Sequence, residues 1–192
     1  MIGMDTLVVA GSGEARSLHP ELFQARARAT VRYADPAAWI TAAAAANAIL
    51  NVTDKLAASL HEVGMIVVSD QGPAFTMAEV NAATSNGFSS PLRYAAASPG
   101  SLAGVACIAL GFRGPTLNFT MLPDDGVPVA LQLCSGWLSR RAARYVVLAT
   151  FRAADLTTGF SRAVLLTRRE SGQGFGNLLT QSVADWLIQI GD

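Results

Sequence analysis

Few side chains in this sequence can supply a nucleophile or a base. The chain contains two cysteines, Cys107 and Cys134, and two histidines, His19 and His61. Both cysteines lie inside apolar segments, where burial raises the pKa of a thiol and leaves it inert. Their spacing indicates neither a metal site nor a disulfide. Neither histidine is spaced to pair with a cysteine or a carboxylate, so we expect both histidines at the surface.

A pair of adjacent carboxylates, Asp124 and Asp125, offers a second kind of chemistry. At a strand-to-helix turn, two carboxylates can act as an acid and a base or can bind a cation. The same residues come just before an expected helix, Val127–Leu138, where they would cap free N–H groups and stabilise the positive helix end by about 0.3–1 kcal/mol. Capping is the stronger interpretation.

Two glycine-rich segments could bind phosphate groups. Gly11-Ser-Gly13 follows an expected strand, but Arg16 stands where a dinucleotide fingerprint has its third glycine. Gly172, Gly174 and Gly176 precede the last expected helix, where a flexible connection is favoured over a phosphate cradle. We therefore expect no cofactor and no metal ion.

Composition limits the class of protein. The chain has 192 residues, of which 51% are hydrophobic and 15% are charged, and its formal net charge is zero. We expect one domain over residues 1–192. A net charge of zero argues against nucleic acid and against an anionic membrane as partners. Because residues 1–10 lack a basic flank and a long apolar run, we expect neither a signal peptide nor a membrane span, and a cytoplasmic location.

Arginines form two short clusters in the sequence. The first contains Arg140, Arg141 and Arg144, and the second contains Arg168 and Arg169. Such groups are usually solvated ends of helices or strands. Docking of a carrier protein is the alternative interpretation.

Alternating strands and helices predict an α/β fold with a mainly parallel mixed sheet covered by helices on both faces. Asp35 and Pro36 supply an N-cap and a first-turn proline for a long alanine-rich helix. The expected strands are Thr6–Ala10, Gly64–Ser69, Thr116–Thr120, Arg144–Ala149 and Arg162–Thr167. The expected helices are Ala37–Leu60, Thr76–Ser85, Pro99–Leu110, Val127–Leu138 and Asn177–Ile190, with turns at Gly11–Gly13 and Met121–Gly126.

The segment Ser98–Thr120 resembles the approach to the active site of β-ketoacyl synthases. In that family a helix of small residues ends in a Leu-Gly-hydrophobic-Arg/Lys-Gly-Pro turn, which Leu110–Pro115 reproduces. A strand then delivers a nucleophilic cysteine at a tight elbow before the next helix. The resemblance covers about Trp39 to Thr167 and is strongest from Ser98 to Ala149. It implies the N-terminal half of the thiolase-like, condensing-enzyme fold.

The departures from the family pattern bear on function. Counted from the Gly-Pro turn, the nucleophile's position falls on Pro123, which has no nucleophilic atom and no N–H group. Met121, Leu122 and Asp124 replace the small residues that flank the elbow. The family's two catalytic histidines come from its C-terminal half, which we expect this chain to lack. Condensation needs both the thiolate and the imidazoles.

The resemblance thus implies a non-catalytic subunit, similar to the chain-length factors of type II polyketide synthases and to short ketosynthase-like proteins of aryl polyene clusters. Such a subunit pairs with an active β-ketoacyl synthase, and an acyl carrier protein can contact the complex. In that family the strand before the elbow forms the dimer contact, which here implies Asn118, Phe119, Thr120 and Met121. Met121, Leu122 and Pro123 would then shape the partner's acyl tunnel.

Two other hypotheses stay open at this point. One is an acyl-thioester enzyme that uses Cys134 or the Asp124 and Asp125 pair. The other is a homodimer with a structural or sensing role.

Overall fold

The computed structural model describes residues 7–17, 23, 33–88, 90–169 and 180–189. Its five strands form one sheet in the order β1-β5-β4-β2-β3. β5 runs antiparallel to both of its neighbours, whereas β1, β4, β2 and β3 run in one direction. The predicted mainly parallel mixed sheet is therefore confirmed. The strand bounds are β1 Leu7–Ala15, β2 Val63–Val68, β3 Thr116–Phe119, β4 Tyr145–Ala153 and β5 Gly159–Arg168.

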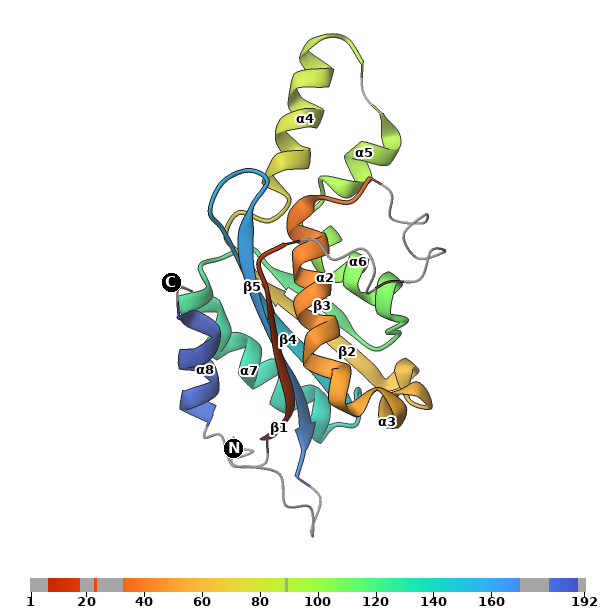
Figure 1. The fold of residues 1–192 in the computed structure, drawn as a ribbon, viewed down its shortest axis with the longest axis vertical. Helices are drawn as coiled ribbons and strands as arrows, with labels where there is room; N and C mark the ends of the chain where they lie inside the picture. Colours follow the sequence, from red (N-terminus) through yellow and green to blue (C-terminus); the bar gives the residue numbers. More distant parts are fainter. Residues whose placement is uncertain (1–6, 18–22, 24–32, 89, 170–179, 190–192) are drawn as a thin grey trace.

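Helices cover both faces of this sheet, as the sequence predicted (Figure 1). α2 and α6 pack on one face, and α7 and α8 pack on the other. The helix bounds are α2 Pro36–Ile49, α3 Thr53–Ala57, α4 Ala74–Ser85, α5 Pro91–Ala96, α6 Ser101–Leu110, α7 Pro123–Ser139 and α8 Thr180–Ile188, with 3₁₀ turns at Leu50–Val52 and Leu60–Glu62. The expected last helix is confirmed over α8; residues 177–179 and 190 lie outside the described residues.

Close packing of α2 on β1 explains Gly11 and Gly13. A Cβ atom on Gly13 would lie 2.6 Å from the carbonyl oxygen of Ala44, and one on Gly11 would collide with the carbonyl oxygen of Ala48. The predicted turn at these glycines is wrong, because β1 continues to Ala15 and pairs with β5 on both sides of a shift in register between Val9 and Gly11. The glycines allow helix and strand backbones to touch, and that packing fills the space that a phosphate would need.

The predicted N-cap at Asp35 is confirmed. This buried carboxylate accepts a hydrogen bond from the backbone N–H of Ala37 at 2.8 Å and a second from the N–H of Thr76 at 2.8 Å. Ala37 belongs to α2 and Thr76 to α4, so one side chain caps the start of α2 and holds α4 beside it.

The single long helix predicted to reach Leu60 is wrong, because α2 ends at Ile49. The Thr53 hydroxyl donates to the carbonyl oxygens of Ile49 and Leu50 at 3.1 Å each. These bonds satisfy carbonyl groups that a continuing helix would have paired, and the chain turns toward β2.

β4 and β5 form a hairpin, which accounts for the one antiparallel strand in the interior of the sheet. Its turn is held by Asp155, whose carboxylate accepts hydrogen bonds from the Thr158 and Thr157 hydroxyls and from their backbone N–H groups. These bonds, led by that of the Thr158 hydroxyl, lower the pKa of Asp155 to about 2. Five residues cannot contain a crossover helix, so β5 returns antiparallel.

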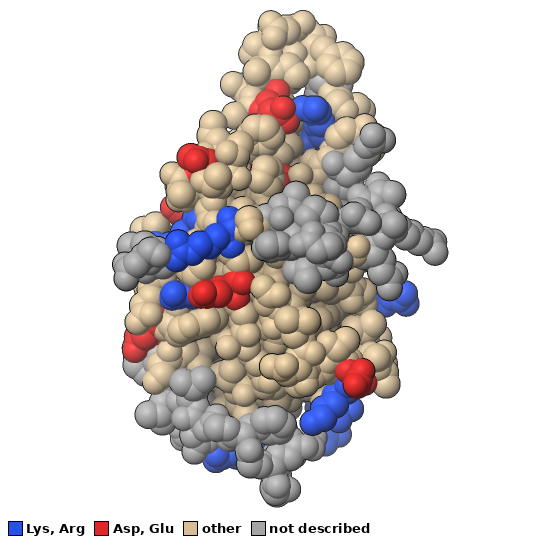
Figure 2. Space-filling view, viewed as in Figure 1, with Lys and Arg blue, Asp and Glu red and all other residues tan. Residues whose placement is uncertain are grey.

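α4 and α5 project from the rest of the protein as an arm (Figure 1), and the space-filling view shows the same projection (Figure 2). Arg93 of α5 pairs with Glu79 of α4 at 2.7 Å. Phe88, Leu92 and Tyr94 are exposed. α5 was not predicted from the sequence. In the part of the chain that the structure describes, no helix combines the length and the apolar character needed to cross a bilayer.

Candidate functional site

The elbow predicted between β3 and the next helix is present, but it is shorter than expected. β3 ends at Phe119, and α7 begins at Pro123. The predicted turn from Met121 to Gly126 and the predicted helix start at Val127 are therefore wrong by about one helical turn. Pro123 occupies the first helical position, where its fixed φ angle suits a helix and its missing N–H costs nothing.

Gly126 makes the elbow tight. A Cβ atom at this position would collide with the Cγ1 atom of Val68 and would lie 2.9 Å from the Cγ atom of Met121. Val68 is the last residue of β2 and is fully buried. The first turn of α7 therefore lies directly against the carboxyl end of β2.

Pro123 itself is buried at the N-terminus of α7. Its side chain carries no atom that can attack a thioester, and its backbone nitrogen cannot donate to an oxyanion. Counting from the Gly-Pro turn predicted Pro123 for the nucleophile's position, and the structure places this proline at the start of α7.

Asp124 forms an ion pair with Arg152 of β4. Arg152 also donates to the carbonyl oxygen of Ile188 at 3.2 Å, so it links the start of α7 to the end of α8. The hydrogen bond from Arg152 holds the pKa of Asp124 below its usual range. The predicted capping is wrong, because the N-cap residue of α7 is Leu122 and no side-chain cap hydrogen bond forms there. An ionised carboxylate in the first turn still suits the helix dipole, whereas a general acid needs a raised pKa. Asp125 is exposed in the same turn.

The cysteines lie in environments that suppress their reactivity. Cys134 is fully buried in α7, and burial strongly raises the pKa of its thiol. Cys107 is partly buried in α6 with its Sγ atom 3.5 Å from the Thr116 Oγ1 atom, and burial raises its pKa by more than this hydrogen bond lowers it. His61 lies exposed in a 3₁₀ turn.

Two of the sequence candidates cannot be placed. His19 and the glycines of residues 172–176 lie outside the described residues. Among the residues that are described, no group of three or more His, Cys, Asp or Glu side chains could hold a metal ion.

The residues that the resemblance assigned to a dimer contact lie together on the edge strand β3 and just after it. Within the described residues β3 pairs only with β2. Asn118 accepts a hydrogen bond from the Ala103 N–H at 3.2 Å and donates to the Gly100 carbonyl at 3.4 Å, which ties the strand to α6. Met121 is 37% exposed and Leu122 is 49% exposed.

A small cavity lies beside this edge. It has a volume of about 10 Å³ and lies between the carboxyl ends of β2 and β3 and the start of α6. Its lining residues are Val67, Ser69, Gly72, Pro99, Leu102, Asn118, Phe119 and Thr120. This volume is on the scale of one water molecule, so this cavity cannot hold an acyl chain in the isolated subunit.

No family model and no curated protein matches the sequence. Solved structures do match. A ketosynthase in complex with its chain length factor from Xenorhabdus doucetiae superposes with a TM-score of 0.59 at 16% identity, and the match covers 95% of this chain and 92% of that chain. A β-ketoacyl synthase from Burkholderia phymatum gives a TM-score of 0.67 at 9% identity over 86% of this chain. The chain has the ketosynthase fold.

A third match concerns a structure of a type II polyketide synthase acyl-carrier protein in complex with its ketosynthase. Its TM-score is 0.66 at 13% identity, and it covers 86% of this chain. The chain spans 63% of the matched chain in that complex, 59% of the Burkholderia chain and 41% of a matched ketosynthase from Bacillus amyloliquefaciens. The thiolase-like fold implied by the Leu110–Pro115 turn is thus confirmed.

Proposed function

We propose that this ketosynthase-like chain is a non-catalytic subunit that pairs with an active β-ketoacyl synthase, in the manner of a chain length factor. The observation that carries the proposal is Pro123 at the first position of α7, directly after the elbow. Without a thiolate at that point the chain cannot hold an acyl group as a thioester. The buried thiol of Cys134 and the partly buried thiol of Cys107, whose pKa values are both raised, offer no replacement.

The edge of β3 is the contact that we propose for the partner. An edge strand presents unpaired N–H and C=O groups, which a second strand can complete. Phe119 is half-buried there, and the exposed Met121 and Leu122 continue an apolar surface into the elbow. We propose Asn118, Phe119, Thr120 and Met121 as the contact residues.

We propose further that Met121, Leu122 and Pro123 close or shape the partner's acyl tunnel. These residues follow the proposed contact strand, and the adjacent cavity of about 10 Å³ is too small to hold an acyl chain without the partner's walls. The matched complex of a ketosynthase with its chain length factor, in which the matched chain has nearly the same length, supports this arrangement. We include an acyl carrier protein among the partners of the complex, because one matched structure contains such a protein bound to its ketosynthase.

Residues 1–192 would then form a single ketosynthase-like domain. Two reasons favour a heterodimer over a homodimer. Two copies of this chain would supply no nucleophile at either elbow, and the proposed tunnel has a use only beside an active site.

The test is co-expression of the tagged chain with each β-ketoacyl synthase of its source organism, followed by native mass measurement. We expect a complex of one copy of each chain. Met121→Arg places an unpaired charge in the proposed contact and should weaken the complex at least about tenfold. Leu50→Arg is the matched control, because Leu50 is also apolar and exposed but lies beyond the end of α2. The proposal would be overturned if both variants weakened the complex equally, or if the chain formed a homodimer and no complex with any of the ketosynthases.

A further inference from the structure

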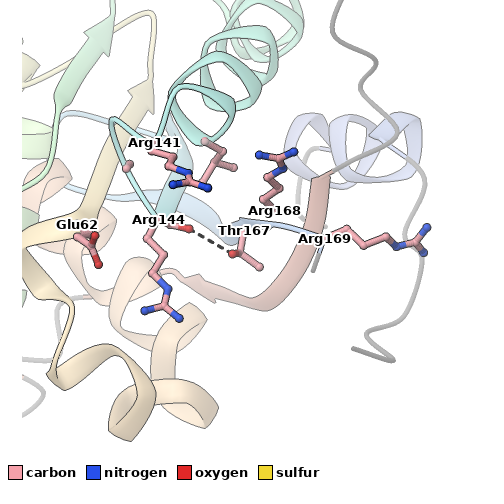
Figure 3. Close-up of a pocket in the computed structure, with 8 residues that line it drawn as sticks. Glu62, Arg141, Arg144, Thr167, Arg168 and Arg169 are labelled. Carbon is pink, nitrogen blue, oxygen red and sulfur yellow. Dashed lines mark hydrogen bonds between the residues drawn. The ribbon is translucent and has the colours of Figure 1, made fainter. Parts of the chain in front are cut away.

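A pocket of about 500 Å³ lies at the end of the sheet opposite to the elbow. It opens where α7 ends, β4 begins and β5 ends (Figure 3). Its lining residues are Glu62, Leu138, Arg141, Ala143, Arg144, Thr167, Arg168 and Arg169. The volume falls in the range of small-molecule sites.

The pocket concentrates positive charge in a chain whose formal net charge is zero. Four of its lining residues are arginines, and Glu62 is the one carboxylate among them. Within the described residues, no carboxylate forms an ion pair with Arg141, Arg144 or Arg168. Guanidinium groups without protein carboxylates are available to an anion from solution.

Arg141 holds its place in this pocket at a conformational cost. Its φ angle is +58°, and no other non-glycine residue of the described chain has a positive φ. The Ala142 N–H donates to the Trp137 carbonyl at 2.9 Å and the Arg141 N–H donates to the Leu138 carbonyl at 3.3 Å, a helix ending that favours glycine at the left-handed residue. Because glycine would end α7 with less strain, the arginine indicates a use for its side chain.

The pocket side chains come from separate elements. In Figure 3 the Arg141 and Arg168 side chains extend into the same part of the pocket, one from the turn after α7 and one from the end of β5, whereas Arg169 extends away from them. Thr167 joins the end of β5 to the residue just before β4, because its hydroxyl donates to the Arg144 carbonyl at 3.2 Å.

We propose that this pocket binds the phosphate group of a small molecule, as a phosphomonoester or a diphosphate, with Arg141 and Arg168 as its main ligands. Paired guanidinium groups match phosphate oxygens in two-point hydrogen bonds. The concave shape favours a small ligand over the flat acidic surface of a protein. The proposal does not depend on the proposed ketosynthase partnership, because the pocket lies where β4 begins and β5 ends, whereas the proposed contact residues lie at and just after the carboxyl end of β3.

Calorimetric titration of the full chain with inorganic pyrophosphate tests the proposal, with inorganic phosphate as a second probe. We expect saturable binding at one site that weakens as sodium chloride is raised. Arg168→Gln and Arg141→Gly should each weaken pyrophosphate binding about tenfold or more. Arg140→Gln is the matched control, because Arg140 is the adjacent arginine and does not line the pocket; it should change the affinity less than twofold.

Arg141→Gly also separates binding from folding. Its thermal midpoint without ligand should equal or exceed that of the unaltered chain, because the left-handed strain is relieved. The proposal is overturned if pyrophosphate does not bind, or if Arg140→Gln weakens pyrophosphate binding as much as Arg168→Gln does. It is also overturned if a hexaglutamate peptide binds at least as tightly as pyrophosphate, because that result would assign the pocket to an acidic protein surface.

Discussion

Asp35→Ala is expected to be the most damaging single polar substitution in the described fold, because one buried carboxylate caps α2 and holds α4. The carboxylate is 1% exposed and accepts two backbone hydrogen bonds, each of 2.8 Å, from Ala37 and Thr76. Loss of an N-cap costs about 0.5–2 kcal/mol, and a second buried N–H without a partner costs about 1–3 kcal/mol. The free energy of unfolding should therefore fall by about 3 kcal/mol.

Urea denaturation followed by circular dichroism measures this loss. A fall of about 3 kcal/mol corresponds to roughly 6–12 °C in the thermal midpoint of a chain of this size. Asp35→Asn keeps one acceptor oxygen and should lose about half as much. Asp54→Ala is the control, since Asp54 is exposed in α3 and should change the free energy by less than about 0.5 kcal/mol. An Asp35→Ala variant within 0.5 kcal/mol of the unaltered chain would refute the double-cap interpretation.

Three further predictions concern packing, thiols and pH. Gly13→Ala should lower the free energy of unfolding by about 1–3 kcal/mol in urea denaturation, because its methyl group would force α2 away from β1; an unchanged value would contradict the packing. In the folded chain Cys134 should resist alkylation, and Cys107 should react faster as pH rises above about 8.5, because burial raises the pKa of both thiols. Rapid alkylation of either thiol at pH 7 would contradict this low reactivity. The pKa of Asp124 is lowered in the folded chain, so its ionised form stabilises the fold above the unfolded pKa, and this effect is lost as pH falls below about 4. Because Asp124 is largely exposed, Asp124→Asn should lower the free energy of unfolding in urea at neutral pH by less than about 1 kcal/mol, and its difference from the unaltered chain should shrink as pH falls; a difference that does not change with pH would contradict the pairing.

Local patterns in the sequence were enough to predict the features that depend on neighbouring residues. Asp35 and Pro36 mark the start of α2 because a cap and a first-turn proline act within a few residues. The continuous apolar run of β2 predicts a strand covered on both faces, and all of its residues are buried. The resemblance carried by the Leu110–Pro115 turn implies a strand and an elbow after it, and β3 and the start of α7 follow.

Contacts between distant segments escaped prediction. Gly11 and Gly13 have the pattern of a turn until α2 is placed against them, and that helix begins more than twenty residues later. Arg152 carries no local pattern that links it to Asp124, although the pair joins β4 to α7. The left-handed conformation of Arg141 is equally invisible in the sequence, because the residue type that suits it is glycine.

The central claim is that Pro123 leaves this chain unable to carry an acyl group. Intact mass measurement tests it directly, with the purified complex of this chain and its ketosynthase incubated with an acyl thioester. The expected result is an added acyl mass on the ketosynthase alone, with this chain at its unmodified mass. An acyl adduct on this chain, whether in the complex or by itself, would contradict the account.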